Sequence, residues 1–252
     1  MKQVLIILLV VSLLLLSACV AQDNTGAGNM TAKGSTVQIT SGGQQYPAYV
    51  AAPSGSGTYP GIVLIHSFNG LEQGYKDMID QFAAEGYVVV APEWQTYNRS
   101  PGDAVVEALV RDTNSYLVTR PDVDRNRLGL TGFCAGGRYT MLLLPKIQEF
   151  QSGVAWYGFP YNAGSGNTTP ASLVGDLTAP MLIIHGTADK PSPVADIYRY
   201  ATELDGAGKY FELKVYQGEP HGFMIQNGTL SKSFVAKDAY TEMVRFFDRT
   251  LT

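Results

Sequence analysis

The chain has 252 residues, of which 45% are hydrophobic and 16% charged, so it can form one large core and is neither a disordered protein nor a coiled coil. Its 18 Lys and Arg against 22 Asp and Glu give a net charge of −4 with no run of like charge, which argues against nucleic-acid binding. The two cysteines, Cys19 and Cys134, form no CxxC pair, so we expect neither a disulfide framework nor a structural zinc site.

The first residues have the pattern of an export signal. Lys2 supplies a positive start, and residues 4–16 form an apolar run broken only by Ser12. This run has signal-peptide length and is shorter than the roughly 20 residues that span a bilayer as a helix. It ends in Leu-Ser-Ala-Cys at 16–19, which resembles the lipobox of prokaryotic lipoproteins.

The lipobox resemblance implies cleavage before Cys19 and lipidation of its thiol; an uncleaved signal anchor is the alternative. Residues 1–18 are then a lipoprotein signal peptide, and 19–35 are the lipidated Cys with a small, polar, Gly-containing tether. Residues 36–252 form the globular domain. We expect this domain to be exported and lipid-anchored to the membrane, in the cell envelope or at the cell surface.

From residue 35 onward, predicted strands and helices alternate. A Ser-Gly-Gly turn at 41–43 joins the first two strands into a hairpin, and most later strands are continuous apolar runs, which is typical of strands covered on both faces. The predicted strands are residues 35–40, 45–51, 61–66, 87–92, 127–133, 153–157, 181–186 and 211–216, and the predicted helices are 71–85, 103–117, 135–150, 192–204 and 237–251.

Such alternation predicts an α/β fold, a mostly parallel, doubly wound sheet with helices on both faces. Ligands of such sheets bind at the carboxyl ends of the strands. Functional residues are therefore expected in the loops that follow His66, Pro92, Phe133, Gly186 and Tyr216.

The strongest chemical signal is Gly-Phe-Cys-Ala-Gly-Gly at 132–137, between a predicted strand and a predicted helix. It fits the Gly-x-nucleophile-x-Gly elbow, with Cys134 in place of the usual Ser. The start of the following helix favours a thiolate at this position. A buried structural cysteine in a Gly-rich turn is the alternative.

An acid and a histidine follow in the order that α/β-hydrolases use for their triads. Asp189 lies in the loop after strand 181–186, and His221 in the loop after strand 211–216. His221 is one of only three histidines. The other two, His66 and His185, fall at strand ends, where we expect them to be packed and hydrogen-bonded.

These motifs resemble the dienelactone hydrolase family. The resemblance rests on Pro-Asp-Val-Asp at 121–124, the elbow segment 127–138, Gly-Thr-Ala-Asp at 186–189 and His-Gly-Phe at 221–223, and it runs from about residue 36 to 251. It implies an α/β-hydrolase fold that acts on esters or lactones without a metal or organic cofactor.

The same resemblance assigns roles to individual residues. Cys134 would be the nucleophile, His221 the general base and acid, and Asp189 the residue that orients His221. The backbone N–H groups of Phe68 and Ala135 would form the oxyanion hole.

Two positions depart from the pattern of that family. Its characterised members place a Glu just before the oxyanion-hole residue, where this chain has Ser67. They also hold a substrate carboxylate with two arginines; Arg99 lies where one is expected, and the other position is Ile225. A dienelactone is therefore not the expected substrate, and the resemblance leaves the substrate open.

Other residues near the same edge could contact substrate. Glu93 follows strand 87–92 and is either a site residue or an exposed loop carboxylate. Trp94 and Phe223 are candidates for the walls of an apolar pocket, as are Trp156 and Tyr157, with packing in the core as the alternative.

The sequence therefore predicts a cysteine-dependent hydrolase of ester, lactone or thioester bonds that works through a covalent thioester. Its expected partners are a small-molecule ester or lactone and, through Cys19, the membrane, with no nucleic acid and no metal. The alternative is a catalytically silent binding lipoprotein that retains the α/β-hydrolase fold at the cell surface.

Overall fold

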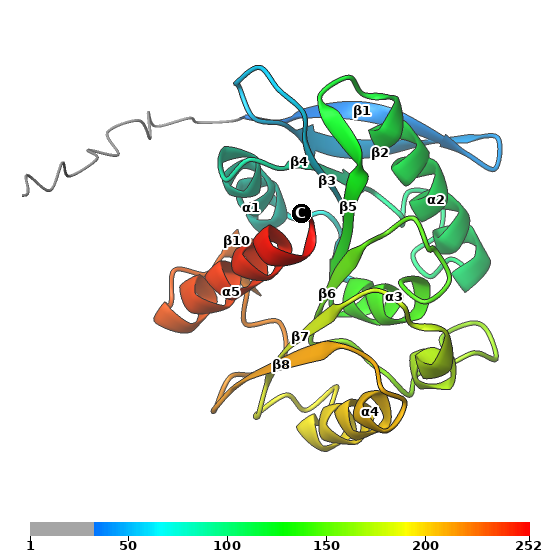
Figure 1. Ribbon diagram of the computed structural model, residues 1–252, viewed down its shortest axis with the longest axis vertical. Helices are drawn as coiled ribbons and strands as arrows, with labels where there is room; N and C mark the ends of the chain where they lie inside the picture. Colours follow the sequence, from blue (N-terminus) through cyan, green and yellow to red (C-terminus); the bar gives the residue numbers. More distant parts are fainter. Residues whose placement is uncertain (1–32) are drawn as a thin grey trace, which may run out of the picture.

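The computed structural model describes residues 33–252, so the predicted signal peptide, Cys19 and most of the predicted tether lie outside the described residues. Eight strands form one sheet in the order β1-β2-β4-β3-β5-β6-β7-β8 (Figure 1). β1 and β2 pair antiparallel, β2 pairs antiparallel with β4, and all other neighbours are parallel. The strands are β1 (Ser35–Ser41), β2 (Gln44–Ala51), β3 (Tyr59–Ile65), β4 (Val88–Pro92), β5 (Val123–Phe133), β6 (Ser152–Trp156), β7 (Met181–Gly186) and β8 (Phe211–Tyr216).

Helices cover both faces of this sheet. One face carries α1 (Gln73–Ala84) and α5 (Phe234–Thr250), and the other carries α2 (Asp103–Thr119), α3 (Ala135–Leu143) and α4 (Val194–Gly206) (Figure 1). The predicted mostly parallel, doubly wound α/β architecture is confirmed. Among the described residues, no helix is long and apolar enough to cross a membrane.

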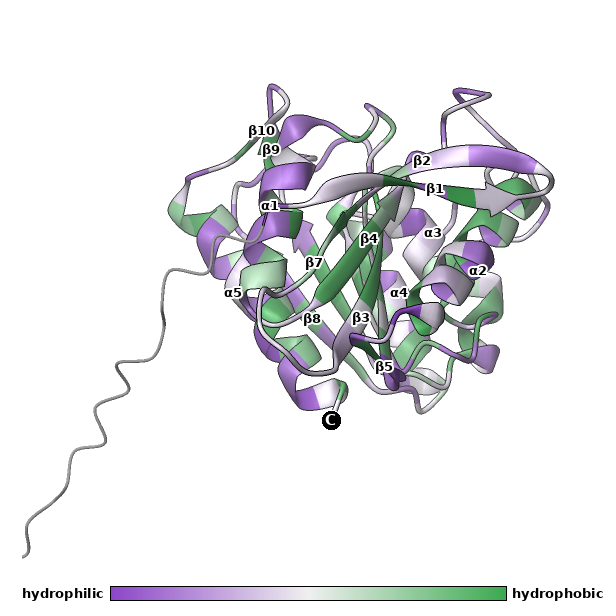
Figure 2. Ribbon diagram, turned by 90° about the horizontal axis from the view of Figure 1, so that it is seen from above, coloured by the Kyte–Doolittle hydropathy of each residue, from purple (hydrophilic) through white to green (hydrophobic). Residues whose placement is uncertain are grey.

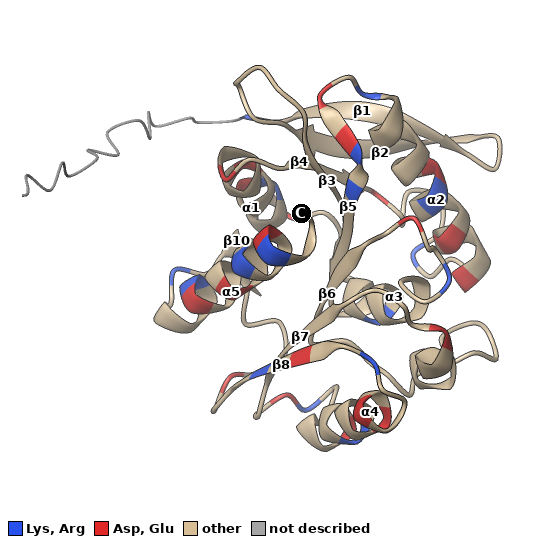
Figure 3. Ribbon diagram, viewed as in Figure 1, with Lys and Arg blue, Asp and Glu red and all other residues tan. Residues whose placement is uncertain are grey.

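Burial on both sides of the sheet explains the continuous apolar strands. Every residue of β4 and β6 is buried. The strands in the middle of the sheet are coloured as hydrophobic in Figure 2, and β3, β4 and β6 contain no Lys, Arg, Asp or Glu (Figure 3). Alternate strand residues enter two separate clusters, one beneath α1 and α5 and one beneath α2, α3 and α4. Each fully buried large apolar side chain contributes about 1.5–3 kcal/mol.

Most element boundaries lie within three residues of the predicted ones, but β5 begins four residues earlier than predicted, at Val123, and one helix ends much earlier. The predicted helix 135–150 ends as α3 at Leu143, because Pro145 has no N–H to donate to the carbonyl of Met141 and the chain continues in turns. Two small elements were not predicted: the 3-10 helix η1 (Pro170–Asp176), and the hairpin of β9 (Ile225–Gln226) and β10 (Thr229–Leu230).

Candidate active site

The turn between β5 and α3 holds Cys134 in a strained backbone conformation. Its φ of 59° and ψ of −112° lie where residues other than glycine seldom occur, and its N–H donates to the carbonyl of Trp156 at 3.0 Å. A Cβ at Gly132 would lie 2.3 Å from the carbonyl oxygen of Gly136, and one at Gly136 would lie 1.9 Å from the carbonyl oxygen of Ile65. The glycines of the motif are therefore what allows this turn to close over β3.

Asp189 and His221 meet across the loops after β7 and β8. The Nδ1 of His221 donates to Oδ2 of Asp189 at 2.7 Å, because a carboxylate can only accept. The other carboxylate oxygen accepts the N–H of Ser192 at 2.8 Å. The side chain of Asp189 is fully buried, so both oxygens are fixed by these partners.

Two effects compete at His221. Burial disfavours the charged imidazolium, but the hydrogen bond to Asp189 and the adjacent Cys134 thiol favour it more, and the pKa of His221 rises to about 9. The second ring nitrogen, Nε2, is buried without a hydrogen-bond partner among the described residues, and the imidazole lines a small cavity together with Cys134. This nitrogen is the one available for proton transfer.

The other two histidines are packed inside, as predicted. His185 donates from Nε2 to the carbonyl of Ser192 at 2.8 Å, and burial lowers its pKa, so it stays neutral beside Asp189. His66 stacks on Trp94, and burial lowers the pKa of His66 to about 4. Neither imidazole lines the cavities at Cys134.

Phe68 and Ala135 are the residues predicted to supply the two N–H groups of an oxyanion hole. Ala135 is the first residue of α3, and Phe68 lies in the loop after β3. Within residues 33–252, neither N–H donates to a protein acceptor. Both residues line the larger cavity together with Cys134, as the two donors of an oxyanion hole must.

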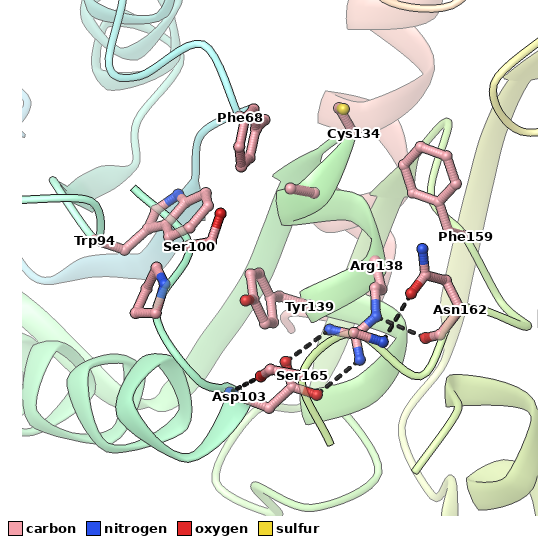
Figure 4. A pocket seen from close by; sticks show the side chains of 13 residues that line it. Phe68, Trp94, Ser100, Asp103, Cys134, Arg138, Tyr139, Phe159, Asn162 and Ser165 are labelled. Carbon is pink, nitrogen blue, oxygen red and sulfur yellow. Dashed lines mark hydrogen bonds and ion pairs between the residues drawn. The ribbon is translucent and has the colours of Figure 1, made fainter. Parts of the chain in front are cut away.

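That larger cavity, which we call the substrate pocket, has a volume of about 540 Å³. Its walls include the aromatic side chains of Phe68, Trp94, Tyr139 and Phe159, with Cys134 at one end (Figure 4). The volume is within the range of small-molecule sites.

An ion pair lies at the far end of the substrate pocket. Arg138 donates from both terminal nitrogens to Asp103, at 3.0 and 2.7 Å, and from Nε to the carbonyl of Asn162 at 2.7 Å (Figure 4). The side chain of Arg138 is only 6% exposed. Asp103 neutralises its charge, and its bonds to Asp103 and Asn162 tie α2 and the loop after β6 to α3.

Of the remaining predicted site residues, some line the cavities at Cys134 and others do not. Trp94 lines the substrate pocket, and Ser67 lines the smaller cavity. Glu93 lines neither cavity, and Arg99 is exposed with its guanidinium 4.9 Å from the centre of the Phe68 ring. Phe223 lines neither cavity, because it is 1% exposed and packed in the core against Trp156 and Tyr216.

Sequence reasoning missed the contribution of the loop after β6. This loop supplies Phe159, Asn162 and Ser165 to the substrate pocket. It begins at the carboxyl end of a predicted strand, so the rule that pointed to the other loops should have included it. Within the described part of the chain, no three His, Cys, Asp or Glu side chains form a group that could hold a metal ion.

Comparison with known proteins gives consistent relatives. Residues 46–251 match the model of the "Dienelactone hydrolase family". The chain is 31% identical over 223 residues to the "Putative carboxymethylenebutenolidase" of Methylorubrum extorquens, covering 80% of this chain and 76% of that protein. It is 29% identical to the Salmonella typhimurium protein of the same name, covering 83% and 84%.

A solved structure shares the fold. The crystal structure of the "Putative Dienelactone Hydrolase" from Klebsiella pneumoniae superposes with a TM-score of 0.77 at 26% identity, covering 86% of this chain and 99% of that one. The eight-stranded sheet with its covering helices is therefore an α/β-hydrolase fold.

Proposed function

The chain belongs to the dienelactone hydrolase family, and on that basis we propose that it hydrolyses ester, lactone or thioester bonds with Cys134 as the nucleophile. The observation that carries the proposal is the strained elbow at Cys134 beside an imidazole that is hydrogen-bonded to a buried carboxylate at 2.7 Å. This arrangement of nucleophile, base and orienting acid is the one that covalent hydrolysis requires.

The first half-reaction forms a thioester. The Cys134 sulfur attacks the substrate carbonyl carbon as a thiolate, while the charged imidazole of His221, whose pKa is about 9, holds the thiol proton on Nε2. The N–H groups of Phe68 and Ala135 stabilise the oxyanion of the tetrahedral intermediate. That intermediate collapses with cleavage of the ester C–O bond, and His221 gives its proton to the departing oxygen. The start of α3 and the positive imidazolium both stabilise the thiolate.

The second half-reaction returns the free enzyme. Water attacks the thioester carbonyl carbon while His221 Nε2 accepts its proton. The C–S bond then breaks, the acid leaves, and the proton returns from His221 to the Cys134 sulfur. Asp189 keeps Nδ1 protonated throughout, so that Nε2 remains the nitrogen that accepts and donates protons.

The substrate pocket favours a neutral, apolar group on the carbonyl side of the ester. Its walls include four aromatic side chains, and the charge of its buried cation, Arg138, is neutralised by Asp103. The position of the second carboxylate-binding arginine in characterised relatives is Ile225, which does not line this pocket. The carboxymethylenebutenolidase name of the relatives therefore supports lactone chemistry here more than it supports a carboxylate-bearing substrate.

The proposal extends to the location of the enzyme. The positive start, the apolar run and the Leu-Ser-Ala-Cys sequence at 16–19 support export and lipidation at Cys19. The domain would then act at the membrane surface in the cell envelope, on substrates that reach it from outside the cytoplasm.

Hydrolysis of p-nitrophenyl acetate by the purified protein tests this function. We expect turnover that falls in proportion to the fraction of Cys134 alkylated by iodoacetamide, and none in Cys134→Ala. A Cys134→Ala variant that retains full turnover would contradict a cysteine nucleophile. Absence of turnover toward esters, lactones and thioesters alike would favour the silent binding protein.

A further inference from the structure

A second cavity, much smaller than the substrate pocket, reaches Cys134 from the side of the histidine. Its volume is about 50 Å³, and its walls include Ser67, Glu72, Cys134, Tyr157, His221 and Ile225. His221 lines this cavity and does not line the substrate pocket, whereas the oxyanion-hole residues Phe68 and Ala135 line only the substrate pocket. Cys134 is the residue at which the two cavities meet. We call the smaller one the rear cavity.

Unsatisfied polar atoms belong to residues of the rear cavity. Tyr157 is 1% exposed, and its Oη has no hydrogen-bond partner within residues 33–252. His221 Nε2 is also buried without a protein partner in the described chain. A buried polar group left without a partner costs about 1–3 kcal/mol, so the Tyr157 hydroxyl indicates a polar occupant of this cavity.

Tyr157 has an unfavourable backbone conformation beside the rear cavity. Its φ is 35°, a conformation that costs about 1–3 kcal/mol for a residue other than glycine. The N–H of Tyr157 donates to the carbonyl of Ile184 at 2.8 Å, and its ring packs on the His221 imidazole with centroids 5.1 Å apart. Burial raises the pKa of Tyr157 well above 10, so its hydroxyl keeps its proton and can donate.

The size of the rear cavity fits water and excludes a substrate group. A bound water needs about 10–15 Å³ and two to four polar partners. The cavity offers more than that volume, but it holds only a tenth or so of the space in the substrate pocket. Glu72, at the N-terminal end of α1, adds a carboxyl group to the wall, and desolvation raises its pKa.

We propose that the rear cavity holds the water that hydrolyses the acyl-enzyme, with Tyr157 Oη and His221 Nε2 as its partners. This inference rests on the proposed role of Cys134 as nucleophile. The Tyr157 hydroxyl donates to the water oxygen, and one water proton points at Nε2. The water oxygen attacks the thioester carbonyl carbon, its proton passes to Nε2, and the C–S bond breaks. The acyl group meanwhile remains on the opposite side of Cys134, in the substrate pocket.

The variant Tyr157→Phe tests the proposal, because it removes the hydroxyl and keeps the ring. We expect the rate of Cys134 acylation by p-nitrophenyl acetate to change less than about twofold. The rate of thioester hydrolysis should fall about tenfold or more, as expected for losing one positioned hydrogen bond to the reacting group. The p-nitrophenolate burst should then be followed by a slower steady state, and mass spectrometry should find acetyl-Cys134 accumulating during turnover.

A matched control is available in Tyr200, another buried tyrosine whose hydroxyl has no partner among the described residues. It lies on α4 and lines neither cavity. Tyr200→Phe should leave both half-reactions unchanged. Hydroxylamine, a stronger nucleophile than water, should restore turnover of Tyr157→Phe, since it attacks the thioester without needing the hydroxyl.

Several outcomes would overturn the inference. Acylation and deacylation rates that fall together would mean that Tyr157 acts only by packing, and an unchanged deacylation rate would remove its role altogether. If Tyr157→Phe does not fold, Ile225→Phe narrows the rear cavity from another wall and must slow deacylation selectively. If the wild type turns over but no acyl group is ever found on Cys134, even after rapid acid quenching, the proposed function fails instead.

Discussion

Replacing Asp189 by Asn should impair catalysis far more than it impairs folding. The Oδ1 of an asparagine at this position can still accept the N–H of Ser192, as the carboxylate does at 2.8 Å. Its amide nitrogen then faces Nδ1 of His221, where the carboxylate now accepts at 2.7 Å. Because an amide nitrogen can only donate, Nδ1 must become the acceptor, and the ring proton moves to Nε2. A protonated neutral Nε2 cannot take a proton from Cys134 or from water.

The expected size of this effect follows from the same wrong-tautomer substitution in the serine-protease triad, which lowers kcat by about 10⁴, or roughly 5.5 kcal/mol of transition-state stabilisation. A thiol ionises more readily than a serine hydroxyl, so for Asp189→Asn we expect a fall in kcat of about 10²–10⁴. The loss of folding free energy should be about 1–3 kcal/mol, the cost of one charge-assisted hydrogen bond.

The same substitution should change how His221 titrates. With Asp189 present the pKa of His221 is about 9, so the imidazole is largely charged at neutral pH. Loss of the carboxylate removes the strongest effect that favours the cation, so the pKa of His221 should fall, with burial opposed only by the neighbouring Cys134. The His221 contribution to stability, which in the wild type is full below pH 6.5 and is lost as pH rises through 9, should decrease.

Steady-state kinetics, thermal unfolding followed by circular dichroism, and NMR titration of the histidine ring measure these three quantities. The reasoning is refuted if Asp189→Asn keeps more than about a tenth of the wild-type kcat while remaining folded. It is equally refuted if the His221 titration is unchanged.

Three further predictions concern the elbow, the substrate and the anchor. Gly136→Ala should lower the free energy of unfolding by about 1–3 kcal/mol, because the added Cβ would lie 1.9 Å from the Ile65 carbonyl oxygen. The control variant Gly175→Ala, whose Cβ would meet nothing within 4 Å, should leave the Tm unchanged. Of two phenyl esters that differ only in the end of the acyl chain, the uncharged one should have a kcat/KM at least about tenfold above that of the one with a terminal carboxylate. If the carboxylate ester is preferred instead, and Arg99→Gln abolishes that preference, then the exposed Arg99 binds the substrate anion and the reasoning is wrong. Cys19→Ser should leave an uncleaved precursor that incorporates no labelled fatty acid, and lipid labelling that persists would exclude the lipobox.

The sequence predicted the framework of the site because that framework depends on local patterns. Continuous apolar runs located the strands, and the glycines around Cys134 predicted the strand-to-helix elbow that the structure shows closing over β3. The order of Cys134, Asp189 and His221 then placed three side chains at one edge of a parallel sheet, where Asp189 and His221 are in fact hydrogen-bonded.

The rest depends on contacts between distant segments, which no local pattern encodes. Phe223 lies two residues after the motif histidine His221, yet its side chain turns into the core between Trp156 and Tyr216. Asp103, 35 residues away from Arg138 in the sequence, neutralises the charge of Arg138 in the substrate pocket, and only the folded arrangement of α2 and α3 brings the two side chains together. The hydroxyl of Tyr157 became significant only when its burial beside the rear cavity was known.

The central claim is that Cys134 carries the acyl group during turnover, and rapid quenching followed by mass spectrometry tests it most directly. Protein mixed with p-nitrophenyl acetate and quenched in acid within the burst phase should carry one acetyl group, located on the peptide that contains Cys134 and removed by hydroxylamine. The p-nitrophenol released in the burst should match the acetyl group in amount. Ester turnover that continues with Cys134 unmodified at every quench time, or with the acetyl group on another residue, would contradict the account.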